Sequence, residues 1–166
     1  MRTIWLVRHG IAADATRGMR DAERPLTKEG IERMESAARA WRKLGPTPDV
    51  IVTSPLLRAR QTGKILHDAF DLDDGPLVCD ALAAGGGADD LLRFIARDAP
   101  EESGVACVGH MPDLPRLLGE ITGAGAAFGA DFGKGTVAAI EFPGALRVGA
   151  GTLRALIPNR VLRAIG

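Results

Sequence analysis

The sequence is poor in several features, and each shortage excludes a class of protein. Basic and acidic side chains number 21 each, so no charge excess marks a general binder of nucleic acid or of membrane surfaces. Only Cys79 and Cys107 are present, without CxxC spacing, which favours two small buried side chains in a reduced, cytoplasmic protein over a disulfide framework. No run approaches the roughly 20 apolar residues of a membrane helix, and the amino-terminal residues lack a signal-peptide pattern.

Length and composition favour a single globular domain. A chain of 166 residues, 46% apolar and 25% charged, is expected to fold as one domain spanning residues 1–166. Strand-like and helix-like segments alternate along it, as is typical of layered α/β proteins. We therefore predict a three-layer α/β/α sandwich with a mostly parallel central sheet, widened by a hairpin near the carboxyl end.

Local patterns place the predicted elements. Strands are expected at residues 3–7, 49–52, 77–79, 105–108, 136–142, 146–148 and 153–157. Helices are expected at residues 28–44, 54–70, 89–97 and 112–121. Thr27 is the expected N-cap of the first helix and Gly45 its end, whereas Ser54 and Pro55 are expected to open the second. The polar segment 11–26 is long for a loop, and loops of unusual length are often functional. The segment 122–135 is rich in glycine and alanine.

The segment Arg8-His9-Gly10 directly follows the first predicted strand. Gly10 allows a sharp turn, so Arg8 and His9 are expected to emerge at the carboxyl end of the strand, where open α/β sheets place their ligand sites. An arginine fork matches a phosphoryl group, and a histidine can act as a nucleophile. These residue types in this position indicate phosphoryl chemistry.

Two further groups follow the same placement. Arg58 lies in the first turns of the second predicted helix, where backbone N–H groups already favour anions. His110 follows the strand at residues 105–108, after Gly109. If these strands are parallel neighbours, two arginines and two histidines converge at one sheet edge and can stabilise a phosphoryl transition state.

Four motifs occur in order: Arg8-His9-Gly10, Arg24-Pro25-Leu26-Thr27, the segment SPLLRARQT at 54–62, and Val108-Gly109-His110. With them almost the whole chain resembles the histidine phosphatase, or phosphoglycerate-mutase-like, superfamily. Within that superfamily the chain looks most like the SixA-type phosphohistidine phosphatases, because it is short, lacks a lid domain and contains the RPLT run. The resemblance implies a metal-independent phosphatase without cofactor, with His9 as the nucleophile and Arg8, Arg58 and His110 as the phosphate pocket.

The resemblance leaves the rim of the site open. Arg24, Gly10 and Ser54 are expected to bind substrate, although Arg24, like Arg17 and Arg20, lies in a loop that is at least as typical of a solvated surface. His67, the third histidine, is expected at the end of a helix, where a positive charge favours the dipole.

A proton donor for the leaving group is not obvious. Many superfamily phosphatases place a glutamate between the second and third motifs, and here the corresponding stretch reads Leu77-Val78-Cys79-Asp80-Ala81-Leu82. Asp80 is either that general acid or a surface carboxylate after a strand. A phosphorylated imidazole leaves through a nitrogen that carries its own proton, whereas an alkoxide needs general acid catalysis, typically worth about 10²–10⁴-fold.

Three functions follow from this pattern. The first is dephosphorylation of phosphohistidine on a protein through a phospho-His9 intermediate. The second is a small-molecule phosphomonoesterase or mutase of the same superfamily that acts on a phosphorylated metabolite with Asp80 as the acid. The third is a phosphate- or phosphoprotein-binding module without turnover, which the presence of a nucleophile disfavours.

Overall fold

A six-stranded mixed sheet forms the centre of the molecule, in the order β3-β2-β4-β1-β5-β6. The computed structural model describes residues 1–100 and 103–165. The strands are β1 (Arg2–Arg8), β2 (Val50–Thr53), β3 (Leu77–Val78), β4 (Gly104–Gly109), β5 (Val137–Phe142) and β6 (Thr152–Ile157). Strands β3, β2, β4 and β1 run parallel, and β5 is antiparallel to both of its neighbours.

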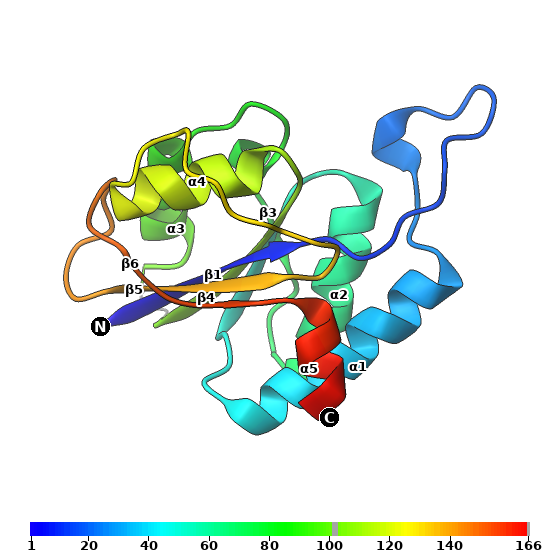
Figure 1. Cartoon of the computed structure of the whole chain (residues 1–166), viewed down its shortest axis with the longest axis horizontal. Helices are drawn as coiled ribbons and strands as arrows, with labels where there is room; N and C mark the ends of the chain where they lie inside the picture. Colours follow the sequence, from blue (N-terminus) through cyan, green and yellow to red (C-terminus); the bar gives the residue numbers. More distant parts are fainter. Residues whose placement is uncertain (101–102, 166) are drawn as a thin grey trace.

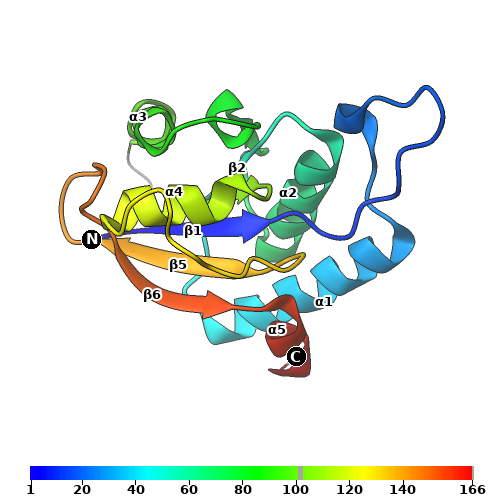
Figure 2. The same cartoon turned by 45° about the horizontal axis from the view of Figure 1, so that its top comes forward.

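Helices cover both faces of this sheet, which confirms the three-layer architecture (Figures 1 and 2). One face carries α1 (Lys28–Leu44), α2 (Leu57–Phe70) and α5 (Asn159–Ile165), and the other carries α3 (Ala88–Asp98) and α4 (Asp113–Thr122). Side chains of β1 alternate between the two cores, with Ile4 and Leu6 in one and Trp5 and Val7 in the other. Within the described part of the chain, no helix is both long enough and apolar enough to cross a membrane.

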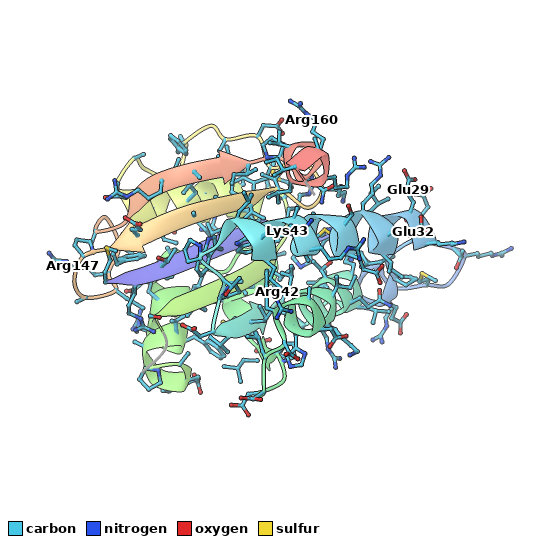
Figure 3. The ribbon with its side chains drawn as sticks, turned by 90° about the horizontal axis from the view of Figure 1, so that it is seen from below. Glu29, Glu32, Arg42, Lys43, Arg147 and Arg160 are labelled. Atoms are coloured by element: carbon cyan, nitrogen blue, oxygen red, sulfur yellow. The ribbon has the colours of Figure 1, made fainter. Side chains whose placement is uncertain are left out.

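Helix α1 follows its sequence signals closely. The Thr27 side chain accepts a hydrogen bond from the Gly30 N–H at 2.9 Å, and Gly45 ends the helix with a φ of 48°. Figure 3 shows Glu29 and Glu32 towards one end of the helix and Arg42 and Lys43 at the other. These charges complement the helix dipole and stabilise the element that packs under the first strand.

Two sequence predictions near the carboxyl end were wrong. Residues 146–148 form no strand; the partner of β5 is instead β6, which was expected as a separate strand. The cause is a contact with α4: the N–H groups of Gly149 and Gly151 donate to the carbonyls of Glu120 and Ile121, at 3.0 Å each, and hold this segment away from the sheet. Helix α5 was not predicted at all.

The start of α2 also differs from the prediction. The N-cap residue is Leu56, so Ser54 and Pro55 precede the helix rather than open it. The backbone N–H of Ser54 donates to the Val108 carbonyl at 3.0 Å, which continues the pairing of β2 with β4. The Ser54 hydroxyl accepts from the N–H of Leu56 at 3.3 Å and lies 2.7 Å from His110 Nε2, and it does not cap the helix.

Two glycines let α1 approach the chain that follows β1. A Cβ atom on Gly30 would lie 2.2 Å from the Ile11 carbonyl oxygen, and one on Gly10 would lie 2.8 Å from Met34 Cγ. Gly10 is therefore required for this close contact with α1 rather than for a left-handed turn. The helix fixes the position of the residues that follow the first strand.

Candidate active site

The register of the parallel strands brings the predicted residues to one edge of the sheet. Arg8 pairs with Gly109 across β1 and β4, and Thr53 pairs with Val108 across β2 and β4. The next residue of each strand is His9, His110 or Ser54, so these three side chains follow the carboxyl ends of three adjacent strands. The rings of His9 and His110 lie with their centroids 5.0 Å apart.

His9 is buried and its ring has a defined tautomer. Nδ1 lies 2.7 Å from the Gly10 carbonyl oxygen, which can only accept, so Nδ1 carries the proton. Nε2 is then an unprotonated nitrogen, and it accepts from Arg58 Nε at 3.3 Å. Burial, followed by the charge of Lys134, lowers the pKa of His9 to about 3. His9 is thus neutral at physiological pH, with an unprotonated nitrogen that accepts from a guanidinium.

Arg58 is buried in the first turn of α2 and contacts two parts of the chain. In addition to its contact with His9, it donates from Nη1 to the Asp21 carbonyl at 2.7 Å and from Nη2 to Asp21 Oδ2 at 2.9 Å. Asp21 belongs to η1 (Asp21–Glu23), a 3₁₀ turn within the long loop that projects beyond β1 in Figure 1. The loop over the site is therefore joined directly to the predicted phosphate-binding arginine.

Arg8 contacts the segment that precedes β5. Its Nη1 donates to the Phe132 carbonyl at 2.6 Å, and its backbone bonds to Gly135 and Thr136. Its Nε is buried and has no hydrogen-bond partner among the described residues. A buried donor without a partner is costly unless a ligand satisfies it, which is the property expected of an anion site.

His110 and Ser54 form a second polar pair. The Ser54 hydroxyl lies 2.7 Å from His110 Nε2, whereas His110 Nδ1 is buried without a partner in the part of the chain described. Burial, and then the charge of Arg58, lowers the pKa of His110 to about 4. Ser54 therefore orients a neutral imidazole beside His9, and an anion bound there would raise the pKa of that imidazole and make it a donor.

Sequence reasoning missed two charged residues of the site, Lys134 and Asp21. Lys134 directly precedes Gly135, whose N–H donates to the Arg8 carbonyl at 3.1 Å. Burial, and then the charges of Arg8, Arg58 and Arg24, lowers the pKa of Lys134 to about 8. The available signal was its place three residues before β5, the strand that pairs with β1. Asp21 had no comparable signal except its spacing of three residues from Arg24.

The remaining predicted residues have other neighbours. Arg24 donates from Nε to the Ala13 carbonyl at 2.8 Å and from Nη1 to Asp21 at 3.0 Å, so it braces the loop. The Gly10 N–H donates to the Thr62 hydroxyl at 3.1 Å. His67 lies in the last turn of α2, as expected, beside Asp68.

Asp80 starts η2 (Asp80–Leu82) and is exposed. It lines a surface hollow together with side chains of α3, among them Asp90 and Arg93. The charged groups that shift the pKa values of His9 and His110 do not include Asp80. Its role as a general acid stays a prediction. Within residues 1–100 and 103–165, no three histidine, cysteine or acidic side chains gather in a way that could hold a metal ion.

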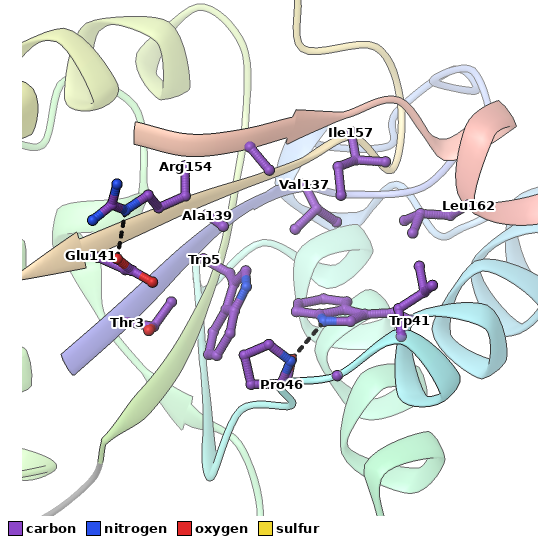
Figure 4. Close-up of a pocket in the computed structure, with 13 residues that line it drawn as sticks. Thr3, Trp5, Trp41, Pro46, Val137, Ala139, Glu141, Arg154, Ile157 and Leu162 are labelled. Atoms are coloured by element: carbon purple, nitrogen blue, oxygen red, sulfur yellow. Dashed lines mark hydrogen bonds and ion pairs between the residues drawn. The ribbon is translucent and has the colours of Figure 1, made fainter. Parts of the chain in front are cut away.

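A second hollow of about 220 Å³ lies on the opposite side of the sheet from α3 and α4 (Figure 4). Trp5 and Trp41 form its floor, and the Trp41 indole donates to the Pro46 carbonyl at 3.1 Å. Its charged side chains, Glu141 and Arg154, form an ion pair with each other at 2.5 Å. It is lined mainly by aromatic and aliphatic side chains, whereas the two histidines and Arg58 meet at the sheet edge that carries His9.

The sequence and the fold of the chain are similar to those of known proteins. Residues 4–80 match the family model described as the histidine phosphatase superfamily, branch 1. An uncharacterized protein from Picosynechococcus sp. is 41% identical over 112 residues, which make up 67% of each chain. A candidate phosphohistidine phosphatase SixA from Nakamurella multipartitia is 30% identical, with a TM-score of 0.73, over 93% of this chain and 94% of the other. The protein histidine phosphatase SixA complexed with tungstate has the same fold, with a TM-score of 0.82 at 23% identity over 95% and 97% of the two chains.

Proposed function

Because the chain belongs to the histidine phosphatase superfamily and is of the SixA type, we propose that it is a phosphatase that removes phosphoryl groups from phosphohistidine on proteins. The observation that carries the proposal is the state of His9, a buried neutral imidazole whose unprotonated Nε2 accepts from Arg58 Nε at 3.3 Å. We call the group of Arg8, Arg58 and His110 around His9 the cup. A neutral nitrogen beside two guanidinium groups is suited to attack phosphorus.

In the first step, His9 Nε2 attacks phosphorus and the bond from phosphorus to the leaving nitrogen breaks. The Nδ1–H of His9, held by the Gly10 carbonyl at 2.7 Å, keeps the attacking ring in one tautomer and stabilises the positive charge that develops on it. Arg8, Arg58 and His110 stabilise the phosphoryl oxygens. In the second step, water attacks phospho-His9, releases phosphate and regenerates the neutral imidazole.

The leaving group explains the preference for phosphohistidine. The imidazole of the substrate leaves as a neutral molecule when its other nitrogen is already protonated, so no enzyme acid is required. An alkoxide leaving group needs a donor, and the carboxylate expected for that role, Asp80, is exposed on η2. This arrangement favours P–N over P–O cleavage.

The surroundings of the site fit a protein substrate. The rim consists of the loop 11–26 and the segment that carries Lys134, without a large insertion. Such an open rim admits a side chain that protrudes from a folded partner. We place the activity in the cytoplasm as part of the proposal, since Cys79 and Cys107 are free and buried.

A substrate panel tests the proposal. Wild type and His9→Ala are compared on a phosphohistidine protein, on a sugar phosphate and on a nucleoside monophosphate. The phosphoenzyme that forms from a phosphohistidine protein carrying labelled phosphorus is trapped by quenching under alkaline conditions. We expect fastest turnover on the phosphohistidine protein, a label on wild type only, and a loss of at least about 10³-fold in kcat for His9→Ala.

The other functions give different results. Faster turnover on the sugar phosphate, lost in Asp80→Asn, would establish the phosphomonoesterase instead. Binding of phosphate without label or hydrolysis would leave a binding module.

A further inference from the structure

Arg58 is held from two directions. A guanidinium has five N–H groups in a planar fork. One at Nη1 and one at Nη2 bind the carbonyl and the carboxylate of Asp21, at 2.7 and 2.9 Å, and the one at Nε points to His9 Nε2 at 3.3 Å. The end of the fork thus binds Asp21, while the edge that contains Nε faces the nucleophile.

Asp21 is itself fixed by a second arginine. Arg24 binds Asp21 Oδ1 at 3.0 Å and the Ala13 carbonyl at 2.8 Å, so it joins both ends of the loop to this carboxylate. Hydrogen bonds from Arg24 and then from Arg58 hold the pKa of Asp21 below its usual range. The carboxylate therefore stays ionised at the pH at which a phosphatase works, although its side chain is 62% exposed.

A carboxylate at this place needs an explanation, because it opposes the binding of an anion. Coulomb repulsion between Asp21 and a phosphoryl group weakens binding, whereas orientation of the Arg58 edge strengthens it. The two effects have opposite signs, so the effect of removing the carboxylate distinguishes them.

We infer that Asp21 is the positioning residue of Arg58, and that the contact turns the Nε edge of the guanidinium towards the phosphoryl group on His9. The inference rests on the proposed function of the same site. It assigns to the loop 11–26 a part in catalysis, exerted through Arg58 and not by contact with the substrate.

The test compares Asp21→Asn and Asp21→Ala with Asp14→Asn, a matched control in the same loop whose side chain is exposed. Calorimetry measures the affinity for tungstate, and assays on a phosphohistidine protein give kcat and KM. Thermal unfolding shows whether each variant is folded. For Asp21→Ala we expect weaker tungstate binding and a kcat lowered about 10- to 100-fold, with a smaller change in KM. Asp21→Asn keeps an acceptor for Arg58 and should fall between wild type and Asp21→Ala, while Asp14→Asn should match wild type.

A double-mutant cycle separates positioning from a general structural role. In an Arg58→Ala background, Asp21→Ala should cause no further loss, since its effect passes through the arginine. Tighter tungstate binding by Asp21→Ala, or an equal loss in both backgrounds, would overturn the inference while leaving an active wild type and the proposed function intact. A folded wild type that neither labels nor hydrolyses would instead overturn the proposed function, and this inference with it.

Discussion

The cup around His9 and the hollow above Trp5 and Trp41 lie at different places on one sheet and differ in what burial does to their side chains. In the cup, burial lowers the pKa values of His9 and His110, and the buried Arg8 Nε and His110 Nδ1 have no partner among residues 1–100 and 103–165. Around the hollow, Trp41 has its hydrogen bond and two aromatic neighbours. The buried polar groups of the cup lower the stability of the fold and make the site reactive, whereas the side chains that border the hollow stabilise the fold.

The largest effect on the free energy of unfolding is expected from a change in the side chains that border the hollow. Trp41→Ala removes edge contacts to Trp5 and Phe70, at centroid distances of 5.6 and 5.0 Å, and should lower the free energy of unfolding by about 3–5 kcal/mol. Denaturant unfolding measures this loss, and kcat should be unchanged at a temperature where the variant is folded. Trp41→Phe is the control and should lose less. A collapse of kcat in folded Trp41→Ala would mean that the two regions are coupled.

A smaller effect should appear as a pH dependence of stability that belongs to the cup. His9 and His110 have pKa values of about 3 and about 4 in the folded protein and near 6.5 when unfolded. Below pH 6.5 the unfolded state therefore binds more protons than the folded state. The contribution of the two neutral histidines to the free energy of unfolding is fully present above this pH and is lost as the pH falls. The loss is expected to be about 2 kcal/mol per histidine at pH 5. Unfolding of wild type and of His110→Gln at pH 7.5 and 5 measures it, and an equal loss in both proteins would contradict the assignment.

The smallest effect concerns Lys134. Its pKa of about 8 means that it is charged below this pH and loses its charge as the pH rises. Because the residue remains exposed to solvent even though its neighbours partly desolvate the ammonium group, we expect KM for an anionic substrate to rise only about two- to fivefold between pH 7 and 9. Lys134→Met should have, at both pH 7 and pH 9, the raised KM that wild type reaches at pH 9, and Lys134→Arg should keep the low KM to higher pH. A steep rise that persists in Lys134→Met would assign the dependence to another group.

The sequence predicts the cup through the strands that carry it. The ends of β1 and β4 follow from short apolar runs, and parallel pairing then brings His9 to His110 without any knowledge of side-chain contacts. The positions of Asp21 and Lys134 cannot be predicted in this way, because both lie in segments that have no hydrophobic periodicity and whose path depends on long-range contacts. The misplaced hairpin strand has the same origin: residues 149–151 bond to the end of α4, a partner that local patterns do not indicate.

The contact between Gly30 and the Ile11 carbonyl ties the reactive imidazole to the packing of a helix. Any side chain at position 30 would wedge α1 away from the strand end and shift His9 relative to Arg58, even if the rest of the fold survived. Tolerance to mutation at this crossing is therefore limited by alignment of the reacting atoms as well as by stability, so variants that still fold should be slow enzymes.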